Sequence, residues 1–126
     1  MRNALNWLLG LTFTLNGLAM FLAPETWYAL TPGVPETGPF NPHFVRDVGC
    51  AYLVCGGALL ALVFRPALWP PAMAAAIFQI LHSLTHVWGA ATGMVAQIHI
   101  LSDLLLVVLP TVLMLWLAWP PREPRV

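Results

Sequence analysis

Charged residues are scarce in this sequence. They make up 8% of the 126 residues, whereas hydrophobic residues make up 60%. Soluble globular domains carry about a quarter charged residues, so the composition excludes an ordinary soluble domain. The longest charge-free interval, between Arg65 and Asp103, holds 37 residues. A helix needs roughly 20 apolar residues to cross a hydrocarbon layer, so this interval holds one full membrane span and the start of another.

The sequence also lacks an excess of charge of either sign and has little cysteine. The formal net charge is zero, so neither a nucleic-acid partner nor a polybasic lipid-binding surface is expected. Cys50 and Cys55 lie five residues apart in one predicted helix and therefore on different faces of it, which disfavours a disulfide between them. We interpret both as small packing residues.

The apolar runs predict an all-α fold, an integral membrane bundle of four transmembrane helices formed by residues 1–126 as one domain. The predicted helices span about residues 4–22, 43–64, 71–88 and 95–119. Asn41-Pro42 is a typical start for the second helix, with an N-cap residue followed by proline at the first helical position. Pro110 has no N–H to donate to the carbonyl of Leu106, so a kink is expected in that turn of the fourth helix.

Small residues predict where the helices touch. Gly10 and Gly17 lie seven residues apart in the first helix and favour close helix contact. In the second helix, a stripe at positions i, i+3, i+7 and i+10 is expected to face the bundle interior. This stripe consists of Asp47, Cys50, Val54 and Gly57.

The longest connection, residues 24–42, contains five prolines and two glycines. This composition prevents a long helix and predicts an extended flap at the membrane interface, anchored among lipid headgroups by Trp27 and Tyr28. Loops of this length are often functional, so the flap is a candidate lid over a site.

The basic residues predict the orientation of the chain. One side of the predicted bundle holds most of them, and the other side holds only Arg46. The basic residues of the first side are Arg2, Arg65, Arg122 and Arg125. By the positive-inside rule, both termini are expected in the cytoplasm.

The third and fourth helices carry three of the four histidines and one acid. His82 and His86 are spaced i, i+4, as are His99 and Asp103, so each pair lies on one helix face. At a rise of ~1.5 Å per residue, His82 should lie level with Asp103, and His86 with His99. A short turn makes the two helices antiparallel neighbours, so the faces can converge. Three further polar residues are expected near the same layer and complete the predicted ligand-binding set: Asn16, Arg46 and Asp47.

Three interpretations of these residues remain open. His82, His86, His99 and Asp103 form a metal site, for which imidazole and carboxylate are suitable ligands. Alternatively, they line a pocket for a small amphipathic molecule such as a quinone, a sterol-like lipid or an organic acid, with a histidine donating to a carbonyl and Asp103 fixing its tautomer. In the third interpretation they are interhelical hydrogen bonds in a scaffold or accessory subunit, each worth about 0.6 kcal/mol. Stand-alone catalysis is not favoured, because the sequence offers no nucleophile with an adjacent base.

Several short segments resemble the small four-helix bacterial inner-membrane proteins of the broad DoxX-like group. They are Asn16-Gly17, Ala23-Pro24, and Arg46-Asp47-Val48-Gly49 at the start of a glycine-rich helix, followed by a third helix that bears histidines. Some members of that group are similar to a membrane subunit of thiosulfate:quinone oxidoreductase. The resemblance implies a bacterial inner membrane and a place beside a quinone, in a redox complex. A metal ion is the other candidate cofactor, from the spacing of the histidines and Asp103. The expected partners are membrane lipids and either further copies of the chain or a larger membrane complex.

Overall fold

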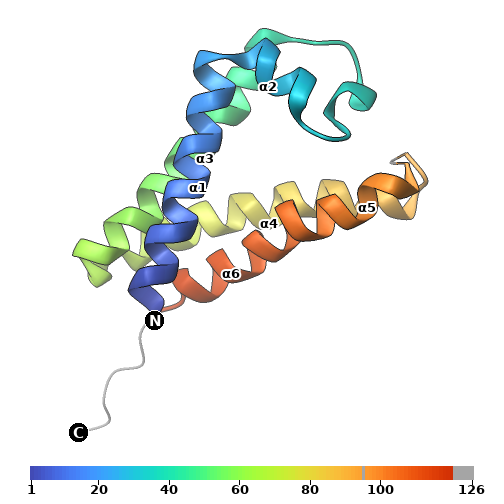
Figure 1. Ribbon diagram of the computed structural model, residues 1–126. Coiled ribbons are helices and arrows are strands. Elements are labelled where there is room, and N and C mark those ends of the chain that lie inside the picture. The colour runs from blue at the N-terminus through green and yellow to red at the C-terminus, as the bar shows by residue number, and fades with distance from the viewer. Residues whose placement is uncertain (95, 121–126) are drawn as a thin grey trace, which may run out of the picture.

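In the computed structural model, which describes residues 1–94 and 96–120, every regular element is a helix (Figure 1). The α-helices are α1 Arg2–Leu22, α2 Pro24–Leu30, α3 Pro42–Phe64, α4 Trp69–Ala91, α5 Gln97–Asp103 and α6 Leu109–Ala118. Two 3-10 turns, η1 Val34–Thr37 and η2 Pro66–Leu68, and one π-helical turn, η3 Leu104–Val108, complete the fold. The all-α prediction is confirmed for the described residues.

Four helical stretches are long and apolar enough to cross a membrane, which makes this a multi-pass membrane protein. They are Arg2–Leu22, Pro42–Phe64, Pro66–Ala91 and Gln97–Ala118. The predicted start at Asn41-Pro42 is confirmed, because the Asn41 side chain accepts the N–H groups of His43 and Phe44 at 3.0 and 3.2 Å. The third helix is longer than predicted, and it includes prolines in its first turn, where a missing N–H costs little.

Helices α1 and α3 pack closely through glycines. A Cβ atom on Gly17 would lie 2.7 Å from the carbonyl oxygen of Gly49, and one on Gly49 would lie 2.8 Å from the Cβ of Met20. A Cβ atom on Gly10 would lie 2.9 Å from the side chain of Leu60. The predicted close contact at Gly10 and Gly17 is confirmed.

The predicted inward stripe of α3 is wrong. Asp47, Cys50, Val54 and Gly57 are exposed, with Val54 at 65%. The face of α3 that packs inward carries Val45, Gly49, Tyr52, Cys55, Gly56, Leu59 and Leu62. A helix that meets lipid on one side and protein on the other is apolar on both, so its periodicity does not identify the buried face. Of the two cysteines, only Cys55 packs in the core.

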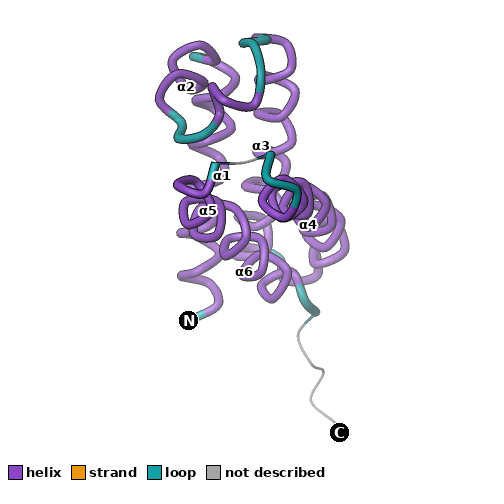
Figure 2. Tube along the Cα trace, turned by 90° about the vertical axis from the view of Figure 1, so that its right-hand side faces the viewer, coloured by secondary structure: helices purple, strands orange, loops and turns teal. Residues whose placement is uncertain are grey.

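The four long helices form two pairs that diverge. Figure 1 shows α1 and α3 rising together, while α4 and the α5–α6 helix run away to the side, and the turned view of Figure 2 agrees. The pairs meet at the end that holds Arg2, Arg65 and Trp119, which we call the terminal end. Here the fully buried residues include Leu59, Ala76, Met114 and Leu117. The pairs separate toward the opposite end, the loop end, which holds η1 and the turn between α4 and α5.

The connection from Pro24 to Pro42 is not an extended flap. Residues Pro24–Leu30 form α2, because Pro24 occupies its first turn and the next proline and glycine come only after it ends. The two aromatic residues bond within the protein instead of serving only as headgroup anchors. The Trp27 indole N–H donates to Asn16 Oδ1 at 2.9 Å, and the Tyr28 hydroxyl donates to the carbonyl oxygen of Gly38 at 2.6 Å.

The irregularity predicted before Pro110 takes the form of the π-helical turn η3. The N–H of Leu109 donates to the carbonyl of Leu104, five residues earlier, and the Thr111 hydroxyl donates to the carbonyl of Val107 at 2.8 Å. The wider turn accommodates the proline without ending the helix.

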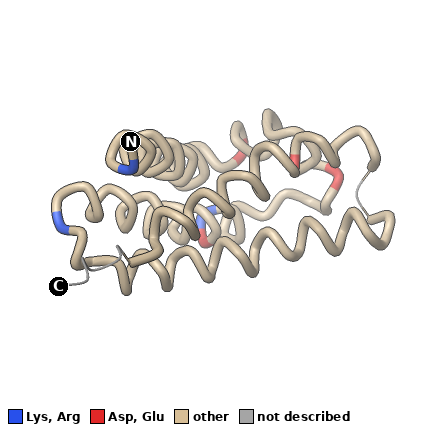
Figure 3. Tube along the Cα trace, turned by 90° about the horizontal axis from the view of Figure 1, so that it is seen from below, with Lys and Arg blue, Asp and Glu red and all other residues tan. Residues whose placement is uncertain are grey.

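The charges are separated along the molecule. In Figure 3 basic positions mark the terminal end, acidic positions lie mainly toward the loop end, and one basic position lies beside an acid. The Arg2 guanidinium donates to the carbonyls of Leu117 and Trp119 at 2.8 and 2.7 Å, which ties the first helix to the last. Arg122 and Arg125 of the orientation argument lie outside the described residues.

Candidate functional site

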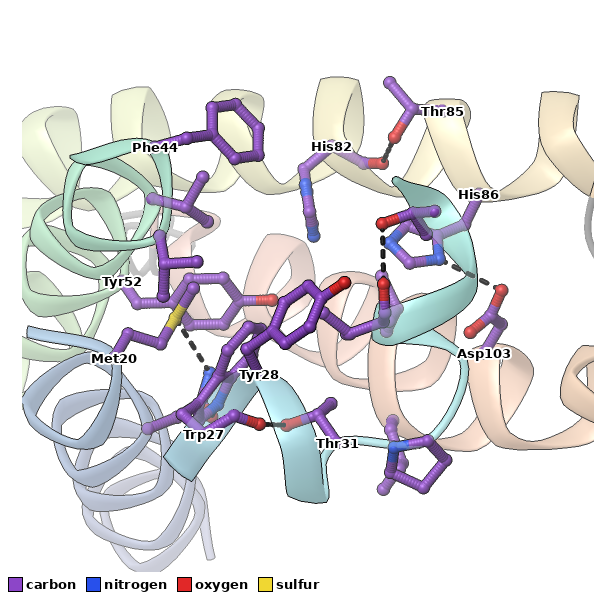
Figure 4. Close-up of a pocket in the computed structure, with 18 of the residues that line it drawn as sticks. Met20, Trp27, Tyr28, Thr31, Phe44, Tyr52, His82, Thr85, His86 and Asp103 are labelled. Atoms are coloured by element: carbon purple, nitrogen blue, oxygen red, sulfur yellow. Dashed lines mark hydrogen bonds and ion pairs between the residues drawn. The ribbon is translucent and has the colours of Figure 1, made fainter. Parts of the chain in front are cut away.

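A cavity of about 870 Å³ lies between the diverging helix pairs and under α2 and the loop that follows it (Figure 4). Every helix from α1 to α5, together with η3 and α6, contributes to its lining. Much of the wall is aromatic. The Phe13 and Tyr52 rings meet edge to face with centroids 5.5 Å apart, and Tyr52 meets the His82 ring in the same way at 5.9 Å. The cavity therefore offers an apolar, aromatic wall to a ligand.

A histidine–aspartate pair forms the polar part of this wall. His86 on α4 and Asp103 on α5 lie with Nδ1 and Oδ2 3.0 Å apart, and their side chains are 29% and 19% exposed. His82 lies one turn before His86, with ring centroids 5.0 Å apart and the rings at 72°. The His82 ring also stacks on the Phe78 ring, with the centroids 6.1 Å apart and the ring planes at 9°. Two rings and one carboxylate thus face the same cavity.

The predicted pairing of these residues is wrong by one helical turn. His86, not His82, meets Asp103, because α4 continues to Ala91 and α5 begins only at Gln97. His86 lies five residues before the end of α4 and Asp103 six residues after the start of α5. At the helical rise these positions are roughly 8 and 9 Å from the turn, and so they are level.

His99 is not part of the predicted cluster and instead contacts the loop around η1. Its Nε2 lies 2.8 Å from Oε1 of Glu36 in η1. The ring also packs against Gly33, where φ is +79° and an added Cβ would lie 3.3 Å from His99 Cγ. Glu36 was missed from the sequence, because only the tertiary fold brings this acid of the long connection to α5.

We expect His99→Phe to loosen this loop with little effect on global stability. The ring packing stays and the hydrogen bond to Glu36 is lost. Because the Glu36 side chain is 60% exposed, the free energy of unfolding should change by less than about 1 kcal/mol. Hydrogen exchange of the η1 amides should nevertheless become severalfold faster, whereas Glu36→Gln, which keeps an acceptor, should have a smaller effect. Unchanged exchange in His99→Phe would show that the pair does not hold the loop.

Asn16 belongs to the cavity, but Arg46 and Asp47 do not. Asn16 lines it and accepts the Trp27 indole N–H. The Arg46 Nε donates to the carbonyl of Phe21 at 3.2 Å, and Asp47 pairs with His43 at 3.4 Å on the surface, where the side chains are 61% and 88% exposed. Asp47 lies on the outward stripe of α3, which explains why its predicted role is wrong.

Of the seven predicted residues, the cavity lining therefore contains Asn16, His82, His86 and Asp103. Lining residues that sequence reasoning missed include Tyr28, Tyr52, Thr85 and Ser102. Thr85 and Ser102 precede His86 and Asp103 directly, so a search for polar neighbours of the histidine pairs would have found these two.

The structure does not assemble the four residues predicted as metal ligands. His99 bonds to Glu36 instead of joining His82, His86 and Asp103. Within residues 1–94 and 96–120, no group of three or more histidine, cysteine, aspartate or glutamate side chains is arranged to hold a metal ion.

Comparisons with protein-family models, curated proteins and solved structures found no match to this chain. The resemblance to the DoxX-like group therefore stays a prediction, and the function has to be argued from the cavity itself.

Proposed function

We propose that this multi-pass membrane protein binds a small amphipathic molecule, quinone-like or lipid-like, in the cavity under α2 and η1. The observation that carries the proposal is the cavity's combination of size and lining. Its volume of about 870 Å³ is within the usual range for sites that hold small organic molecules. Such sites combine a largely apolar wall with a few polar groups that fix the ligand's orientation, which are here Asn16, His82, His86 and Asp103.

The proposed setting is a bacterial inner membrane, with both termini in the cytoplasm. Arg2 and Arg65 at the terminal end support this orientation by the positive-inside rule. Large apolar side chains on outward helix faces, such as Leu8, Leu15 and Leu81 at 65%, 64% and 60% exposure, support lipids as neighbours. The resemblance to the DoxX-like group supports a place beside a quinone, as one subunit of a redox complex.

A scaffold role is the alternative, and the interhelical His86–Asp103 pair favours it. In a scaffold this pair only fixes the register of α4 against α5. Substitution of the cavity residues would then change stability or assembly and leave no ligand affinity to lose.

The proposal is tested by titrating the protein in lipid nanodiscs with a short-chain alkyl quinone and, separately, with a fatty acid. We expect at least one of the two ligands to bind saturably, with one molecule per chain. Binding is monitored by the fluorescence of Trp27, which lines the cavity. Trp27→Phe identifies the signal of that residue among the six tryptophans. Uptake that never saturates and matches empty nanodiscs for both ligands would contradict the proposal.

A further inference from the structure

The His86–Asp103 pair determines which ring nitrogen of His86 is left for a ligand. Nδ1 of His86 lies 3.0 Å from Oδ2 of Asp103, and because a carboxylate oxygen only accepts, the proton of the neutral ring belongs on Nδ1. A neutral imidazole carries one N–H, so its Nε2 then holds a lone pair and accepts hydrogen bonds. Figure 4 shows this second ring nitrogen turned away from Asp103, toward His82 and the interior of the cavity.

Most hydroxyl groups of the lining have their single proton already engaged. Six of the seven hydroxyl-bearing residues of the lining donate to backbone carbonyl oxygens: Thr12, Tyr28, Thr31, Thr37, Thr85 and Ser102. A hydroxyl has one donor and two lone pairs, so these residues still accept but no longer donate. The indole N–H of Trp27 is likewise engaged, by Asn16. These six hydroxyl groups and the Trp27 indole therefore leave no free donor for a ligand, whereas the hydroxyl oxygens still offer it acceptors.

We infer that the ligand's polar head is a hydroxyl group that donates a hydrogen bond to His86 Nε2. This inference rests on the proposed function and narrows its ligand class to hydroxyl-headed amphiphiles, either a hydroquinone or an alcohol lipid. His86 is the binding residue, and Asp103 is a positioning residue that fixes the tautomer of His86. A ligand with only carbonyl or ether oxygens has no proton to donate, so its oxygen lone pairs would repel the lone pair of Nε2.

The test uses two ligands, a para-alkylphenol and its methyl ether, in nanodiscs. They differ only in whether the oxygen carries a proton or a methyl group. The hydroxyl form should bind the wild-type protein about tenfold more tightly, the value of one well-made hydrogen bond in a desolvated site. His86→Phe should reduce this ratio to near one while the ether binds as before. His43→Phe, which changes an exposed histidine outside the cavity, should keep the full ratio.

Asp103→Leu tests whether Asp103 positions the His86 ring or only contributes to helix packing. It should lower the ratio of hydroxyl to ether affinity without weakening the ether, a pattern that loss of structure does not produce. The source of the hydroxyl is then identified by two further pairs, a short-chain hydroquinone with its bis-methyl ether and a long-chain alcohol with its methyl ether. The pair with the larger ratio identifies the natural class.

The outcomes distinguish this inference from the function on which it rests. If neither the quinone, nor the fatty acid, nor any member of these pairs binds saturably, the proposed function itself fails. If the quinone or the fatty acid binds and no hydroxyl ligand does, the ligand-binding function stands and the hydroxyl inference is overturned. If hydroxyl and ether bind the wild-type protein equally, or the ether binds more tightly, the ligand-binding function stands and the hydroxyl inference is overturned. A preference that persists unchanged in His86→Phe also overturns it.

Discussion

Gly17→Ala is expected to destabilise the protein by about 1–3 kcal/mol, although alanine is normally the better helix residue. The added Cβ would lie 2.7 Å from the carbonyl oxygen of Gly49 and 2.9 Å from the backbone nitrogen of Leu53. Both are backbone atoms of α3, so no side-chain rotation relieves the clash and the two helices must separate. Unfolding in detergent, followed by circular dichroism, measures the difference.

Gly57→Ala is the matched control. Gly57 lies in the middle of α3, and an added Cβ would meet nothing within 4 Å. The same substitution there should leave stability unchanged or raise it by about 0.5–1 kcal/mol, the gain of removing a helical glycine. Equal effects at the two positions would contradict the close packing of α1 on α3.

Val48→Trp should strongly weaken ligand binding while the protein stays folded. Val48 lines the cavity from α3, so an indole at this position would occupy space that the ligand needs. We expect the affinity for any cavity ligand to fall by at least about tenfold, or 1.4 kcal/mol, because a packed ring must be displaced before the ligand enters. Titration of the variant with the ligand found for the wild-type protein measures this loss.

Val54→Trp provides the control on the same helix. Val54 is 65% exposed and is not part of the lining, so its variant should bind like the wild-type protein. Unchanged binding in Val48→Trp, with the same unfolding temperature as Val54→Trp, would place the ligand outside the cavity.

The helices were predictable from the sequence, because proline, glycine and charged residues interrupt long apolar runs in few places. The positions of Asn41 and Pro42 fixed the start of α3 well. The orientation of each helix was harder. Lipid and protein interior are both apolar, so the stripe through Asp47 and Val54 looked like a buried face and is instead exposed.

The candidate site was predictable in part of its composition but not in its pairing. His82, His86 and Asp103 were recognised because ionisable groups are costly in a membrane span. An error of a few residues in where α4 ends and α5 begins was enough to pair His82 with Asp103 and His86 with His99. The partner of His99, Glu36, lies in the long connection and reaches α5 only through the fold of α2 and η1. The cavity itself depends on the divergence of the helix pairs, which no local pattern encodes.

The most direct test of the central claim is photo-crosslinking with a diazirine-bearing alkylphenol, followed by mass-spectrometric mapping of the labelled residues. A ligand in the cavity should label lining positions such as Met20, Val48 and Thr85, and unlabelled alkylphenol should compete this labelling away. Labelling confined to outward positions such as Leu8 and Leu81, and unaffected by competitor, would mean that the amphiphile only dissolves in the surrounding lipid and that the cavity is not its site.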